Sequence, residues 1–149
     1  KNMKEQLVNS YDNSILYTDY FLANTIKKLD ELDAVSYLFY ISDHGENLYD
    51  DENDYVLHAY DHPSKIEVHI PMFVWISDKY RDTYPVKHNA IVQNVNKKLS
   101  ADVVFYSLLD MADIVIPDDN CQKSIANPAL ESDSIRFILN PKKEIVALE

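Results

Sequence analysis

Residues 36–51 of the chain read SYLFYISDHGENLYDD, an apolar run that passes directly into a polar turn. The run Ser36–Ser42 is apolar without alternation, and Ile70–Ile76 (IPMFVWI) is a second run of the same kind. Strands that are buried on both faces have this pattern, and such strands belong to parallel or mixed sheets covered by helices. The two runs therefore predict the central strands of an α/β fold.

Helical patterns flank the two predicted strands. Apolar residues recur at helical spacing over Leu7–Leu32, which predicts a long amphipathic helix. The same spacing returns over residues 91–99, after the second strand. Ser100 is expected to be the N-cap of a further helix, because a serine hydroxyl accepts hydrogen bonds from the free N–H groups of a first turn. The order of helix, strand, loop, strand and helices is typical of an α/β protein.

Three segments are expected to be loops or turns. The polar segment Glu46–Val68 between the two strands is long for a simple connection, and ordered loops of such length are usually functional. Residues 117–133 are also expected to be a loop. Ser134–Leu139 and Glu144–Leu148 are expected to pair as a terminal hairpin around the intervening Asn-Pro-Lys-Lys turn.

Composition limits the class of partner. The chain has 149 residues, which suits one domain or a large piece of one, and its formal net charge is −11. This charge disfavours nucleic acid, which proteins bind through lysine and arginine clusters, and it disfavours docking on anionic lipid. No apolar run approaches the roughly 18 residues of a membrane span. The one cysteine cannot form a disulfide within the chain.

Gly45 is the only glycine in the chain, and it directly follows Asp43 and His44. Ligands of open α/β sheets bind beyond the carboxyl ends of the strands, which is where these residues are expected to lie. We expect Gly45 to take a backbone conformation closed to other residues, so that the turn brings Asp43 and His44 to one point.

A carboxylate and an imidazole that converge in this way are suited to bind zinc, and Glu46 is expected to orient one of these ligands. His58 and His62 lie on the loop that follows the same strand, so either can return to this point. Spacing alone leaves open a second interpretation, in which Asp43–Gly45 is an Asx-type turn with a surface histidine.

Five blocks of the sequence carry a resemblance to a known family, and they occur in the order YDNSILYTDYFL, YISDHGENLYDD, LHAYDHPS, HIPMFVWIS and SADVVFYSLLDMADI. Together they resemble the C-terminal half of the sulfatase-type phosphoethanolamine transferases, in the alkaline phosphatase superfamily, over about residues 7–115. Five ordered blocks are more specific than one short motif. The resemblance implies a partial α/β/α sandwich around a mixed, largely parallel central sheet, followed here by the C-terminal hairpin. Residues 1–149 would then be the C-terminal portion of one catalytic domain.

The resemblance also implies a zinc site and a reaction. Asp43 and His44 match the aspartate and histidine metal ligands of the family. His58 matches a family histidine near the transferred phosphate or a second metal, which makes it the expected catalytic residue of this chain. The family nucleophile is a threonine, which takes phosphoethanolamine from a phospholipid donor and passes it to lipid A or another cell-envelope glycan.

The chain departs from the family in one respect. The family's nucleophilic threonine, a glutamate ligand and a further histidine precede the matched blocks, and none of Thr18, Thr25 and Thr83 is placed as a nucleophile. We therefore expect an inactive fragment whose partner is the upstream half of the domain. The parent enzyme is expected in the inner membrane of a Gram-negative bacterium, tethered by N-terminal helices, with this domain in the periplasm.

Two other functions remain open at this stage. One is a sulfatase or phosphohydrolase of the same superfamily, of which a sulfatase uses a modified cysteine or serine nucleophile instead of threonine. The other is a non-catalytic binding module that retains the fold.

Overall fold

The computed structural model describes residues 3–116 and 121–148, so residues 117–120 of the expected loop 117–133 lie outside the described part. The elements follow one another as α1 (Met3–Glu31), β1 (Tyr37–Ile41), β2 (Asn47–Leu48), β3 (Val56–Leu57), α2 (Lys65–Val68), β4 (Met72–Ile76), α3 (Asp78–Thr83), α4 (Pro85–Asn94), α5 (Val103–Met111), the 3-10 helix η1 (Cys121–Lys123), β5 (Arg136–Leu139) and β6 (Ile145–Leu148). This alternation of helices and strands is that of an α/β protein.

The two apolar runs form β1 and β4, which pair with each other antiparallel. Tyr37 lies opposite Ile76, and Ile41 lies opposite Met72. All three strand pairs of the described residues are antiparallel, so a largely parallel sheet is not seen in this part of the chain. The connection from Ile41 to Met72 begins and ends at the same end of the pair, so the two strands run in opposite directions, whereas parallel neighbours need a crossover to the other end.

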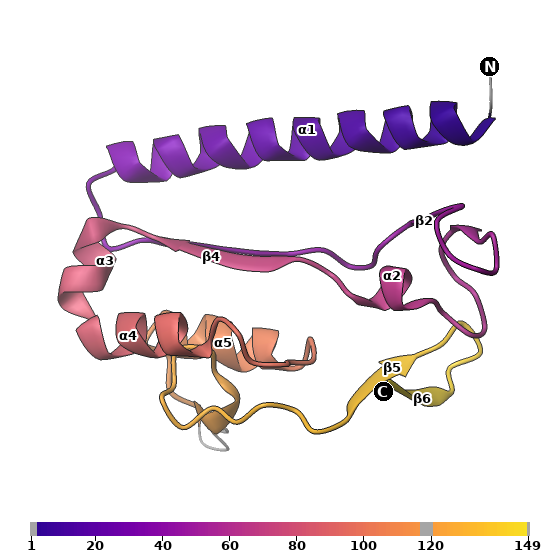
Figure 1. Ribbon diagram of the computed structural model, residues 1–149. Coiled ribbons are helices and arrows are strands. Elements are labelled where there is room, and N and C mark those ends of the chain that lie inside the picture. Colours follow the sequence, from indigo (N-terminus) through magenta and orange to yellow (C-terminus); the bar gives the residue numbers. More distant parts are fainter. Residues whose placement is uncertain (1–2, 117–120, 149) are drawn as a thin grey trace.

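The β1–β4 pair lies between two helical layers (Figure 1). One side faces α1, and the other faces α4 and α5. The hydrophobic core lies on the α4 and α5 side, and its buried members are Tyr80, Val103, Met111, Ile125, Ala126 and Leu130. By contrast, no residue of α1 is fully buried, and Leu16, Tyr17 and Phe21 are exposed. The packing on the α1 side is therefore incomplete in this chain.

The helices confirm part of the sequence pattern and correct the rest. α1 covers nearly all of the predicted helix Leu7–Leu32 and starts four residues earlier. α4 ends at Asn94, so the later part of the predicted helix at residues 91–99 lies beyond it. The N-cap of α5 is Asp102 and not Ser100. The carbonyl of Ser100 instead accepts the N–H of Val103, which makes Ser100 part of a turn before the helix.

The C-terminal hairpin is confirmed. β5 and β6 pair antiparallel, with Arg136 opposite Leu148 and Leu139 opposite Ile145. Asn140 and Glu144 close the turn, because each donates its backbone N–H to an oxygen of the other. Among the described residues, no helix combines the length and the apolar character that crossing a membrane requires.

Candidate functional site

The site lies on the connection between β1 and β4. Because Ile41 is paired with Met72, the chain leaves β1 and enters β4 at the same end of the strand pair. The predicted loop Glu46–Val68 is more regular than expected, since it contains the β2–β3 pair and the helix α2. These elements bring the end of the connection back beside its beginning.

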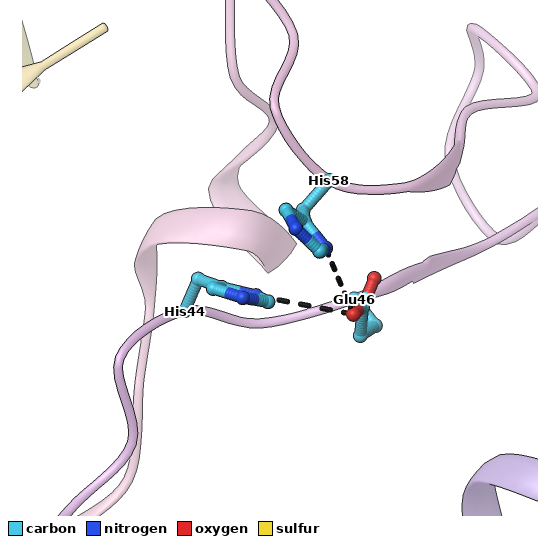
Figure 2. Close-up of side chains that lie close together, drawn as sticks. All are labelled: His44, Glu46 and His58. Carbon is cyan, nitrogen blue, oxygen red and sulfur yellow. Dashed lines mark hydrogen bonds and ion pairs between the residues drawn. The ribbon is translucent and has the colours of Figure 1, made fainter. Parts of the chain in front are cut away.

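Three side chains of this connection converge, and Figure 2 shows them meeting at one carboxylate. The Nδ1 atom of His58 lies 2.9 Å from Oε1 of Glu46, and Nδ1 of His44 lies 3.9 Å from the same oxygen. The two imidazole rings face each other with 3.7 Å between their centroids. One possible ligand atom from each residue lies within 4.8 Å of the others. Two imidazoles and a carboxylate are a donor set that zinc accepts.

An unsatisfied atom supports a cation at this point. The Oε2 atom of Glu46 is buried and has no hydrogen-bond partner among the described residues. A buried carboxylate oxygen without a partner costs free energy, because it has lost its water and gained nothing in exchange. A metal ion held at His44 would satisfy this oxygen. The sequence predicts Glu46 only as a residue that orients a ligand, whereas its position makes it a candidate ligand itself.

Asp43 lies beside His44 but outside this group of three. Its side chain is 87% exposed, and its Oδ2 atom lies 3.7 Å from Nε2 of His44. Hydrogen bonds from its own backbone N–H and from that of His44, followed by the charge of His44, lower the pKa of Asp43 below the usual value. Asp43 is therefore ionised at neutral pH, as a metal ligand must be. Its role as a ligand stays a prediction.

Gly45 is required here for a different reason from the one that the sequence suggests. The φ angle of Gly45 is not positive, so the prediction of a backbone conformation closed to other residues is wrong. Its N–H donates to the carbonyl of Glu67 at 2.7 Å, and a Cβ at this position would lie 2.1 Å from the carbonyl oxygen of Ile66. Glycine permits this close approach of α2 to the turn after β1.

The other loop histidine is not part of the site. Of His58 and His62, only His58 belongs to the group that gathers around Glu46. His58 is flanked by two residues with left-handed backbone, Leu57 with φ 65° and Ala59 with φ 75°. Each such conformation costs a residue other than glycine roughly 1–2 kcal/mol. Nothing in the residue types of this segment indicates that conformation, so sequence reasoning missed it.

Comparison with known proteins places the chain in a family. Residues 1–114 match the sulfatase family. Over 137 residues the chain is 31% identical to phosphoethanolamine transferase EptC of Escherichia coli O18:K1:H7, covering 91% of this chain and 23% of that protein. Over 94 residues it is 35% identical to the Kdo(2)-lipid A phosphoethanolamine 7''-transferase of E. coli K12, covering 60% of this chain and 15% of that protein.

A solved structure agrees with the sequence relatives. The C-terminal periplasmic domain of EcEptC from E. coli, in complex with Zn, superposes with a TM-score of 0.84 at 28% identity. The superposition covers 100% of this chain and 41% of that domain, so the chain spans less than half of the solved domain. It spans less than a quarter of the two E. coli transferases. With a match over most of its length, the chain belongs to the sulfatase family, and the relatives that it resembles are phosphoethanolamine transferases.

Proposed function

We propose that this chain is the C-terminal part of the catalytic domain of a zinc-dependent phosphoethanolamine transferase. The enzyme would move phosphoethanolamine from a phospholipid to lipid A or another cell-envelope glycan. The observation that carries the proposal is the convergence of His44, Glu46 and His58 beside Asp43 at the end of β1. The names of the relatives and the zinc complex of the EcEptC domain support it.

In this proposal Asp43 and His44 hold the zinc ion, and the buried free oxygen of Glu46 fits the same ion. When bound, zinc supplies positive charge that activates a hydroxyl nucleophile and stabilises the phosphoryl oxygens. Glu46 orients the ring of His58 through the 2.9 Å contact at Nδ1. The Nε2 atom is then left to hold a phosphoryl oxygen or, in the protonated ring, to give a proton to the leaving group.

The nucleophile of this reaction belongs to the preceding part of the domain. The hydroxyls of Thr18 and Thr25 donate to carbonyls of their own helix α1. The hydroxyl of Thr83 donates to the carbonyl of Lys79 in α3. These threonines belong to α1 and α3 and not to the connection that carries Glu46. We therefore expect no transferase activity from the 149-residue chain alone.

The upstream half of the domain would also complete the fold. Among the described residues β1 and β4 have only each other as partners, so both outer edges of the pair are free to accept strands. Strands from the upstream half would build the mixed, largely parallel sheet, and the exposed apolar side of α1 would be covered. The parent protein would face the periplasm, held at the inner membrane by helices that precede this chain.

The test uses the full-length protein that contains this chain, with labelled phosphatidylethanolamine as donor and lipid A as acceptor. Zinc content and transfer rate are measured together. Asp43→Ala is expected to lose both zinc and transfer. His58→Ala is expected to keep zinc and to lose roughly 100- to 10,000-fold in rate. His62→Ala is the matched control, because it removes an exposed histidine of the same connection outside the group.

The outcomes separate the possible functions. Unchanged transfer in both the Asp43→Ala and His58→Ala variants would contradict the proposed site. Hydrolysis of sulfate or phosphate esters without transfer would favour a sulfatase or phosphohydrolase. A folded protein with neither activity nor zinc would favour a binding module.

A further inference from the structure

We propose that Glu67, together with Asn47, positions His58 against Glu46 and His44. The proposal rests on the proposed role of His58 in transfer, and it assigns the residues that set the distance between the two histidines. The side chains of Glu67 and Asn47 hold the backbone on both sides of His58, so through these contacts they act on the reaction by positioning this histidine.

The two side chains are buried, and each holds one neighbour of His58. Asn47 is 0% exposed and Glu67 is 8% exposed. The Nδ2 atom of Asn47 donates to the carbonyl of Leu57 at 2.7 Å. Oε1 of Glu67 accepts the backbone N–H of Ala59 at 2.8 Å. The backbone is thus held immediately before and immediately after the histidine.

These contacts explain why an unfavourable backbone persists at this point. Leu57 and Ala59 both have positive φ, which is uncommon for residues other than glycine. Such conformations persist only where the surrounding structure imposes them, and they concentrate at functional sites. The direction of the His58 ring depends on these torsions, so loss of either hydrogen bond would let the segment relax and move the ring.

Glu67 also contacts the backbone beside His44. Its carbonyl accepts the N–H of Gly45, the residue next to His44, at 2.7 Å. Its Oε2 atom lies 3.3 Å from Nδ2 of Asn47, and its own N–H donates to the hydroxyl of Ser64 at 3.1 Å. The Ser64 hydroxyl in turn donates to Oδ1 of Asn47. One buried residue of α2 therefore links the backbone beside His44 to the backbone beside His58.

The experiment compares Glu67→Ala with Glu67→Gln in the full-length protein. Alanine removes the acceptor for the Ala59 N–H, whereas glutamine retains one oxygen that can accept it. We expect Glu67→Ala to lower kcat about 10- to 100-fold with little change in KM, as for other groups that orient a catalytic ligand. Glu67→Gln is expected to restore most of the rate. If Glu67→Ala does not fold, Glu67→Asp carries the same test, because its carboxylate is one methylene short of Ala59.

A double-mutant cycle distinguishes positioning from a general loss of structure. If Glu67 acts through His58, then Glu67→Ala adds no further loss of rate in a His58→Ala protein. Asn94→Ala is the matched control, because Asn94 is another buried amide that holds two backbone carbonyls, those of Ile125 and Asn127. We expect Asn94→Ala to lower stability and to leave kcat of the folded enzyme unchanged.

Two results would overturn the proposal. One is an unchanged kcat in Glu67→Ala, and the other is the same fractional loss with and without His58. A readout independent of activity is the crystal structure of Glu67→Ala, in which we expect the 2.9 Å contact between His58 and Glu46 to be lost. If the wild-type protein shows no transfer, the proposed function is refuted, but the positioning of His58 by Glu67 is not. The crystal structure of Glu67→Ala would then decide the positioning alone.

Discussion

At the scale of single residues, position 45 has no room for a side chain. A Cβ there would lie 2.1 Å from the carbonyl oxygen of Ile66, which belongs to the backbone of α2 and cannot rotate away. We expect Gly45→Ala to lower the free energy of unfolding of the domain that contains this chain by about 1–3 kcal/mol, the usual cost of overpacking. Urea denaturation measures this change.

A second substitution at the same position separates lack of space from backbone conformation. Asparagine tolerates left-handed backbone, so Gly45→Asn would be accepted if conformation were the requirement. Because φ of Gly45 is not positive, we expect Gly45→Asn to be at least as damaging as Gly45→Ala. Glu52→Ala, in the exposed part of the connection, is the control. An asparagine variant as stable as the wild type would contradict this explanation.

Ala59 is a position at which substitution by glycine should not lower the free energy of unfolding. At φ 75° its Cβ is unfavourable, and glycine would relieve this at the cost of greater freedom in the unfolded chain. We expect Ala59→Gly to leave the free energy of unfolding unchanged or to raise it by up to about 1 kcal/mol. Ala23→Gly, on the exposed surface of α1, should instead lower it by about 0.5–1 kcal/mol. Equal losses in urea denaturation of the two variants would show that Ala59 is not strained.

At the scale of elements, a half-buried lysine joins α4 to the end of α5. Nζ of Lys87 lies 2.9 Å from Oδ1 of Asp113 and 3.2 Å from Oδ1 of Asp110. Burial lowers the pKa of Lys87, but the hydrogen bonds to Asp113 and Asp110 outweigh it, and the net result is a raised pKa. A lysine whose pKa is raised by folding stabilises the fold below its unfolded value, and this contribution is lost as pH rises through the folded pKa.

We therefore expect Lys87→Met to lower the free energy of unfolding by about 1–3 kcal/mol at neutral pH, because Asp110 would lose its partner while remaining partly buried. The difference from the wild type should shrink as pH rises above the usual lysine value of 10.5. Urea denaturation over a series of pH values is the measurement. Lys98→Met, at an exposed position in the following segment, should have little effect. A difference that stayed constant through this pH range would contradict the role of the ion pair.

At the scale of the whole molecule, α1 presents an apolar surface that this chain does not cover. Tyr17 and Phe21 lie four apart on one helix face and are 70% and 59% exposed. Since the chain spans only 41% of the related EcEptC domain, we expect the rest of the proposed full-length domain to cover this face. The double variant Tyr17→Ala, Phe21→Ala should then have different effects in the fragment and in the whole domain.

In the 149-residue chain we expect this variant to change the free energy of unfolding by less than about 0.5 kcal/mol, as at other exposed positions. In the proposed full-length domain the loss should be at least about 3 kcal/mol, the cost of removing a buried aromatic ring. Thermal and urea denaturation of both proteins measure the contrast. Lys27→Ala, at an exposed position of the same helix, should be neutral in both. Equal effects in fragment and domain would mean that this face stays in solvent.

The local sequence pattern was enough to predict helices and strands whose formation depends mainly on neighbouring residues. The spacing of apolar residues predicted α1, and uninterrupted apolar runs predicted β1 and β4, because helical and extended periodicity is a property of a few consecutive residues. The turn after β1 also pointed to Asp43, His44 and Glu46, but local pattern left His58 and His62 open, and the family resemblance singled out His58. Local pattern did not establish the direction of pairing, since buried runs of parallel and antiparallel strands look alike when both faces are covered.

Only the tertiary structure decided how these residues work together. Glu46 and His58 are twelve positions apart, and they meet because β2 pairs with β3 and α2 returns to the end of β1. Asn47 and Glu67 look like solvated residues in sequence, yet both are buried with hydrogen bonds to distant partners. The single glycine was visible from the sequence, but its reason was not. Torsional preference is encoded locally, whereas the space available to a Cβ depends on an element twenty residues away that packs against it.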